Sequence, residues 1–131
     1  MKVSVDTNIL VRALVRDDPR QGESAARLLR RASMIAVATP CLCELVWVLR
    51  RVYGFPPSAV SAAIRTLLAA RNVETNRPAA EVGLAMVDAG GDFADGVIAY
   101  EGQWLGAETF VSFDKKAVDV LKAQGVAARL L

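Results

Sequence analysis

The chain has 131 residues, 53% of them apolar, with sixteen basic and fourteen acidic residues and no histidine. This length and apolar content indicate one compact domain over residues 1–131 and exclude a disordered chain. No apolar run approaches the ~20 residues that cross a bilayer. The N-terminus lacks the pattern of a signal peptide, so we expect a cytoplasmic protein that does not contact a membrane.

The apolar periodicity predicts short strands alternating with helices along the whole chain. The predicted elements, in chain order, are a strand at 2–6, helices at 8–15 and 19–32, a strand at 34–38, helices at 40–53 and 56–71, a strand at 72–75, helices at 77–88 and 92–105, a strand at 108–113, a helix at 114–124 and a strand at 126–130. Two of the helix starts are marked by a capping residue before proline, Asp18-Pro19 and Thr39-Pro40.

This alternation predicts an α/β fold with a central, mostly parallel, twisted sheet flanked by helices on both faces. Ligands of such sheets bind beyond the carboxyl ends of the strands. Asp6 and Asp114 stand at two of those ends, and Glu44 and Asp95 lie about one turn into helices that we expect to begin on the same side. The topology therefore makes a cluster of these four acids plausible.

Glu44 gives the strongest argument for a metal. It interrupts the apolar run Leu42–Leu49, which predicts burial, and a buried carboxylate must be paired, protonated or bound to metal. A remote arginine is one partner, and a metal shared with the other three acids is the more economical interpretation. Oxygen ligands without histidine favour Mg²⁺ or Mn²⁺ over Zn²⁺, and no loop of closely spaced acids indicates Ca²⁺.

Each of the other acids has a structural alternative. Asp114 is well placed to cap a helix, Asp92 and Asp95 resemble a capping-box pair, and Asp6 suits a turn after a strand. Cys41 and Cys43 are predicted to be free thiols that only pack, as in a reducing compartment.

Basic residues cluster along the chain, and removing the four acids from the charge count leaves 16 basic against 10 acidic residues. An acidic pocket rimmed by arginine suits a phosphodiester chain. Solvated helix faces are the alternative for any one of these residues. The residues predicted to bind such a chain are Arg27, Arg30, Arg50, Arg51 and Lys115.

Four segments, taken in order, resemble the motifs of PIN-domain ribonucleases, in particular VapC-type toxins of toxin–antitoxin modules. They are Val5-Asp6-Thr7-Asn8, Cys43-Glu44-Leu45-Val46, the stretch Asp92-Phe93-Ala94-Asp95-Gly96-Val97-Ile98-Ala99, and Ser112-Phe113-Asp114-Lys115-Lys116. The resemblance covers essentially the whole chain.

The resemblance implies a PIN fold and RNA cleavage with one or two Mg²⁺ or Mn²⁺ ions held by Asp6, Glu44, Asp95 and Asp114. Supporting roles fall to Thr7, Asn8 and Ser112 as hydrogen-bonding groups and to Asp92 as a helix cap or a holder of metal-shell water. Because the chain has no histidine, we expect hydrolysis to leave 5′-phosphate and 3′-hydroxyl ends rather than a cyclic phosphate.

The resemblance also implies a homodimer, a cognate antitoxin and higher toxin–antitoxin assemblies. The antitoxin would cover the early helices, where the candidate apolar residues are Leu10, Leu14, Leu28, Leu29 and Trp47.

Two other functions stay open, a catalytically silent PIN-like module that binds RNA or protein and an RNA-processing nuclease without an antitoxin. A phosphoaspartate enzyme or a receiver domain fits poorly, because no second acid accompanies Asp6.

Overall fold

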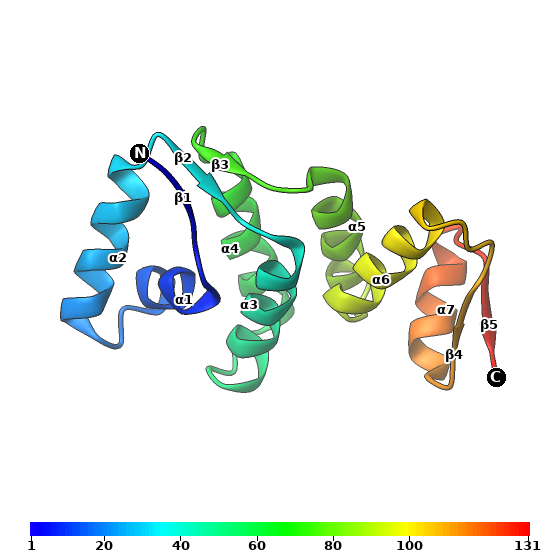
Figure 1. Cartoon of the computed structure of the whole chain (residues 1–131). Coiled ribbons are helices and arrows are strands. Elements are labelled where there is room, and N and C mark those ends of the chain that lie inside the picture. The colour runs from blue at the N-terminus through cyan, green and yellow to red at the C-terminus, as the bar shows by residue number, and fades with distance from the viewer. The chain divides into compact units, whose positions relative to one another are not determined.

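The computed structural model describes residues 1–131 and divides them into two compact units, Met1–Asn76 and Arg77–Leu131. Figure 1 shows strands and helices in each unit. Every strand pairing is parallel, which confirms the α/β fold class. That the whole chain acts as a single domain stays a prediction.

The first unit contains three strands and four helices. They are β1 (Lys2–Ser4), α1 (Thr7–Val15), α2 (Pro19–Arg31), β2 (Met34–Ala36), α3 (Thr39–Arg51), α4 (Pro57–Ala69) and β3 (Val73–Glu74). The strands lie in the order β1-β2-β3, with Ile35 opposite Val3 on one side and Val73 on the other. Ile35 and Val73 are almost fully buried, so the apolar run of the central strand supplies the core under the helices.

The second unit contains two strands and three helices. They are α5 (Arg77–Asp88), α6 (Phe93–Trp104), β4 (Phe110–Ser112), α7 (Lys115–Ala123) and β5 (Ala128–Leu130). Strand β4 pairs with β5 over the whole length of both strands. Met86, Ala99 and Leu121 form the buried centre of this unit, one from each helix.

Helices α5 and α6 approach closely because glycines stand at their crossing. A Cβ atom at Gly83 would lie 2.6 Å from the Phe93 ring, and one at Gly96 would lie 2.5 Å from Cγ of Met86. Atoms cannot approach this closely, so the crossing requires residues without a side chain. This contact fixes the helix that carries Asp95.

All twelve predicted elements are present, and each strand is two or three residues shorter than predicted. Asp18 caps α2 as expected, accepting a hydrogen bond from the Gln21 amide at 3.0 Å. The prediction that Thr39 caps α3 is wrong, because Thr39 is already helical and Ala38 holds the cap position. Proline is tolerated throughout the first helical turn, where amides have no helical acceptor, so its position leaves the start uncertain by a residue.

Candidate functional site

Asp6 follows strand β1 and caps helix α1. Its Oδ1 atom accepts a hydrogen bond from the Thr7 amide at 2.7 Å. The residue is exposed, and its second carboxylate oxygen makes no hydrogen bond within the protein. The cap therefore fixes the carboxylate at the carboxyl end of the strand and leaves one oxygen for a ligand.

Thr7 connects this helix start to α3. It is 5% exposed, and its hydroxyl donates to Sγ of Cys41 at 3.5 Å. Burial raises the pKa of the Cys41 thiol, and the charges of Asp6 and Glu44 raise it further, against the opposing effect of the Thr7 hydrogen bond. Both carboxylates thus lie near the same neutral thiol, and we call them the Asp6 group.

The expectation that Glu44 is buried is wrong, because the side chain is exposed. The residues of α3 that face the core are Cys41, Leu42, Leu45, Val46 and Leu49. Glu44 lies on the opposite face with Trp47, which is 59% exposed. The helix therefore turns the acid toward solvent even though its sequence neighbours are apolar. A metal is not needed to compensate a desolvated charge there.

In the second unit, Asp114 stands between β4 and α7 and caps that helix. Its Oδ1 atom accepts from the Ala117 amide at 3.2 Å, while its own amide donates to the Ser112 hydroxyl at 2.9 Å. The two bonds hold Asp114 from both sides of the strand end. Ser112 therefore orients the backbone of the acid that follows it.

Asp92 and Asp95 begin helix α6. Asp92 caps the helix by accepting from the Ala94 amide at 3.2 Å. Asp95 makes no return bond to the Asp92 amide, so the pair is not a capping box. Asp95 is half-buried, and its pKa is raised by that burial and then by the negative charges of Asp92 and Asp114. We call these three residues the Asp95 group.

The capping roles that we gave as alternatives to metal binding are thus confirmed in part. Asp6, Asp92 and Asp114 do cap helices, but each cap bond uses one oxygen of the carboxylate. Glu44 and Asp95 cap nothing. A capping role is therefore compatible with a second role at the other oxygen, and it accounts for only part of the acidic set.

The structure brings the acids together as these two groups, one in each unit. Within either unit, no three acidic or cysteine side chains come close enough to hold a metal ion by themselves. One site formed by Asp6, Glu44, Asp95 and Asp114 stays a prediction.

The donor chemistry fits a hard divalent cation. Carboxylate oxygens are the available ligands, and the chain has no histidine to compete for the role. Repulsion within the Asp95 group is also the kind of electrostatic cost that a bound cation relieves.

The predicted RNA-binding residues of α2 and α7 are partly paired. Arg27 and Arg30 lie 3.7 and 3.5 Å from Glu23, and Lys115 lies 2.6 Å from Asp119. These pairs are exposed and therefore weak, so the cations remain available to an anion. Arg50 and Arg51 end α3, where both are exposed. Their role in RNA binding stays a prediction.

Sequence reasoning missed a network that holds the turn between α1 and α2. Asp17 accepts from Arg12 at 2.9 Å and from the Tyr53 hydroxyl at 2.8 Å. These bonds lower the pKa of Asp17, chiefly through the Tyr53 hydrogen bond. Tyr53 is 36 residues away from Asp17, so no local sequence pattern predicts this contact.

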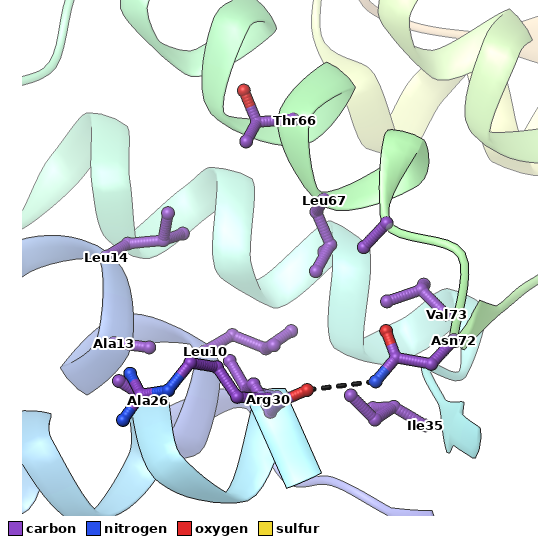
Figure 2. A pocket seen from close by; sticks show the side chains of 12 residues that line it. Leu10, Ala13, Leu14, Ala26, Arg30, Ile35, Thr66, Leu67, Asn72 and Val73 are labelled. Carbon is purple, nitrogen blue, oxygen red and sulfur yellow. Dashed lines mark hydrogen bonds between the residues drawn. The ribbon is translucent and has the colours of Figure 1, made fainter. Parts of the chain in front are cut away.

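An apolar cavity of about 270 Å³ lies among α1, α2, α4, β2 and β3. Leu10, Leu14 and Leu29 line it, together with Leu67 of α4. Figure 2 shows these helices and strands around the cavity, with the Asn72 amide bonded beside it to the Leu29 carbonyl at 2.9 Å. Of the other apolar residues expected to meet a partner, Leu28 lies outside this cavity and Trp47 is exposed on α3.

No helix of the molecule is both long and apolar enough to span a bilayer.

The chain was compared with known proteins. No curated protein matches it significantly. The family model described as the PIN domain matches residues 3–122, which is nearly the whole chain. The match agrees with seven helices and parallel strands, and it confirms the PIN-like α/β fold. The chain therefore belongs to the PIN domain family, whose members are typically nucleases that depend on divalent metal ions.

Proposed function

We propose that this protein is a Mg²⁺- or Mn²⁺-dependent endoribonuclease, the toxin of a toxin–antitoxin module, with Asp6, Glu44, Asp95 and Asp114 as its metal ligands. The observation that carries the proposal is the Asp95 group, in which burial and two neighbouring charges raise the pKa of a carboxylate. Acids perturbed by burial together with specific charged neighbours cluster at functional sites.

The roles of the residues follow from their hydrogen bonds. The Thr7 and Ala117 amides orient Asp6 and Asp114, so that the free oxygens of these acids are positioned before a metal binds. A bound divalent ion would supply Lewis acidity toward a phosphodiester and a water. Because the chain has no histidine for general acid–base transfer, the products should carry 5′-phosphate and 3′-hydroxyl ends.

Cleavage of total cellular RNA by purified protein tests this function. We expect cutting with Mg²⁺ or Mn²⁺, none with EDTA, and none by Asp6→Asn, a change that keeps a side chain able to cap α1. Glu81→Gln, an exposed acid outside both groups, is the matched control and should cut normally. Folded wild-type protein that binds RNA as tightly as Asp6→Asn and never cuts it would instead be a silent binding module.

We further propose that a cognate antitoxin neutralises the enzyme by placing an apolar helix face against the cavity shown in Figure 2. The support is the apolar lining contributed by Leu10, Leu14 and Leu67. Leu14, which is 37% exposed, can be changed to glutamate with less risk to the core than its buried neighbours. Leu14→Glu should retain cleavage and resist inhibition by the antitoxin encoded beside this gene. Unchanged inhibition would show that the antitoxin does not use this cavity, whereas a wild type that no neighbouring gene product inhibits would favour an RNA-processing enzyme without an antitoxin.

A homodimer in the cytoplasm completes the proposal. Cys41 and Cys43 form no disulfide, which suits a reducing compartment. Light scattering of the purified protein would give its mass, and a monomer at micromolar concentration would remove the dimer from the proposal.

A further inference from the structure

The first unit has a polar groove beside the Asp6 group, between helices α1 and α2. Its volume is about 850 Å³, and α1 contributes Asn8 and Arg12 to its lining. Asn8 is two residues from Asp6, and Arg12 lies one turn further along the same helix. At 1.5 Å per residue, the groove covers ~6 Å of α1, from Asn8 to Arg12, and it begins two residues after Asp6.

Hydrogen-bond donors line this groove from both helices. Helix α2 contributes Arg20, Gln21 and Ser24, all of them exposed. The one acid in the lining, Asp18, is half-buried and already accepts from the Gln21 amide as the cap of α2. Side chains that can donate to an anion therefore outnumber acceptors.

The two arginines differ in how they are held. Arg12 donates to Asp17 at 2.9 Å and to the Gln21 side chain at 2.8 Å, so its guanidinium is fixed and its charge is compensated. Arg20 has no ion-pair or hydrogen-bond partner within the protein and keeps its full charge. The groove thus presents one ordered guanidinium and one free one.

Apolar residues also line the groove. Ile9 and Leu28 are among them and are half-buried. Donors together with apolar side chains match a nucleotide, whose phosphate needs donors and whose sugar and base need apolar contact. No aromatic residue lines the groove, so the binding that we expect there relies on contacts to phosphate and sugar rather than on base stacking.

From these observations we infer that the groove between α1 and α2 binds the backbone of single-stranded RNA next to the Asp6 group, with Arg20 as the principal phosphate contact. This inference rests on the proposed nuclease function. It adds a binding site outside the basic clusters at Arg27, Arg30, Arg50 and Arg51.

The test measures binding of a fluorescent, unstructured RNA oligonucleotide in EDTA, where cleavage does not interfere. Arg20→Ala should weaken binding about tenfold. It should also reduce the slope of log affinity against log salt concentration by about 0.7, the value for one phosphate contact to a single strand. Arg20→Lys, which keeps the charge, should retain most of the affinity.

Arg71→Ala removes the same charge from an exposed arginine outside the groove and serves as the matched control. Thermal unfolding of each variant checks the fold, which Arg20 does not support through any hydrogen bond or ion pair. Equal affinities and salt slopes for Arg20→Ala and Arg71→Ala would overturn the inference. So would a wild-type protein that does not bind the oligonucleotide, or an Arg20→Ala effect limited to antitoxin binding.

The binding assay separates this inference from the proposed function. A protein that binds through Arg20 but never cuts supports the groove and refutes the nuclease. A protein that cuts normally after Arg20→Ala, with unchanged KM and kcat, supports the nuclease and refutes the groove.

Discussion

The Asp6 group and the Asp95 group have similar residues and different surroundings. Asp6 and Glu44 are exposed, and their charges act on the neutral Cys41 thiol beside them. Asp95 is half-buried, and the charges of Asp92 and Asp114 act on a third carboxylate. Charge repulsion is therefore built into the second group, which should be the more sensitive of the two to protonation and to bound cations.

The largest expected effect is the loss of cleavage when a ligand of the Asp95 group is neutralised. Asp95→Asn should lower kcat/KM about a thousandfold, because a metal ligand with no capping role is removed. Asp92→Asn leaves the ligand set intact and should lower it far less. Equal losses, measured with an RNA cleavage assay at saturating Mg²⁺, would contradict our placement of Asp95 among the ligands.

A smaller effect concerns the stability that helix packing gives to each unit. Gly96→Ala should destabilise the protein by about 1–3 kcal/mol, because its Cβ would lie 2.5 Å from Cγ of Met86. Gly22→Ala in α2 should cost less, since the nearest atom to its Cβ is the Arg12 carbonyl oxygen at 3.1 Å. Urea unfolding of both variants gives the comparison. The reverse order would show that α5 and α6 separate more easily than α1 and α2.

The cap of α7 contributes less to the free energy of unfolding than the close packing at Gly96. Asp114→Ala should lower the free energy of unfolding by about 1 kcal/mol, through loss of the bond to the Ala117 amide. Asp114→Asn should lose little stability, because asparagine caps as well as aspartate, and should lose RNA cleavage. A stable and fully active Asp114→Ala variant would leave Asp114 with neither role.

The smallest effect is the pH dependence of Asp95. Its pKa is raised in the folded protein, so the native state favours the protonated acid. Its contribution to stability is then complete below the ordinary pKa of about 3.9 and is lost as pH rises through the raised value. Without metal, Asp95→Asn should therefore be more stable than the wild type at pH 7, with no such advantage at pH 3.

Thermal unfolding at both pH values, with and without Mg²⁺, measures this difference. Added Mg²⁺ should stabilise the wild type more than Asp95→Asn, because binding requires the ionised acid. An advantage of Asp95→Asn that grows as the pH falls would reverse the sign that we expect.

The order of elements was predictable from local patterns. Asp18 before Pro19 gave a helix start that the structure reproduces, since the cap bond forms within four residues. The strands came out short, because an apolar run shows which residues are buried and does not show where the pairing with a neighbouring strand ends. The Thr39 cap failed because proline tolerates more than one position in the first turn.

Parts of the site were less accessible to sequence reasoning. Helical spacing places Glu44 on one face with Trp47, an apolar residue that favours burial, and the exposure of both side chains is known only from the structure. Glu44 acts on Cys41 from one turn further along α3, whereas the approach of Asp6 to Cys41 depends on how α1 meets α3. The Tyr53–Asp17 bond is likewise set by tertiary packing.

The carboxylates that cap helices affect which residues evolution would keep if catalysis were lost. A descendant that abandoned catalysis would still need a capping side chain at positions 6 and 114, so aspartate there could outlast the enzyme. Glu44 and Asp95 cap no helix, and such a lineage would be free to replace them. In a chain of this kind, positions 44 and 95 are therefore the ones that distinguish an active nuclease from inactive members of its family.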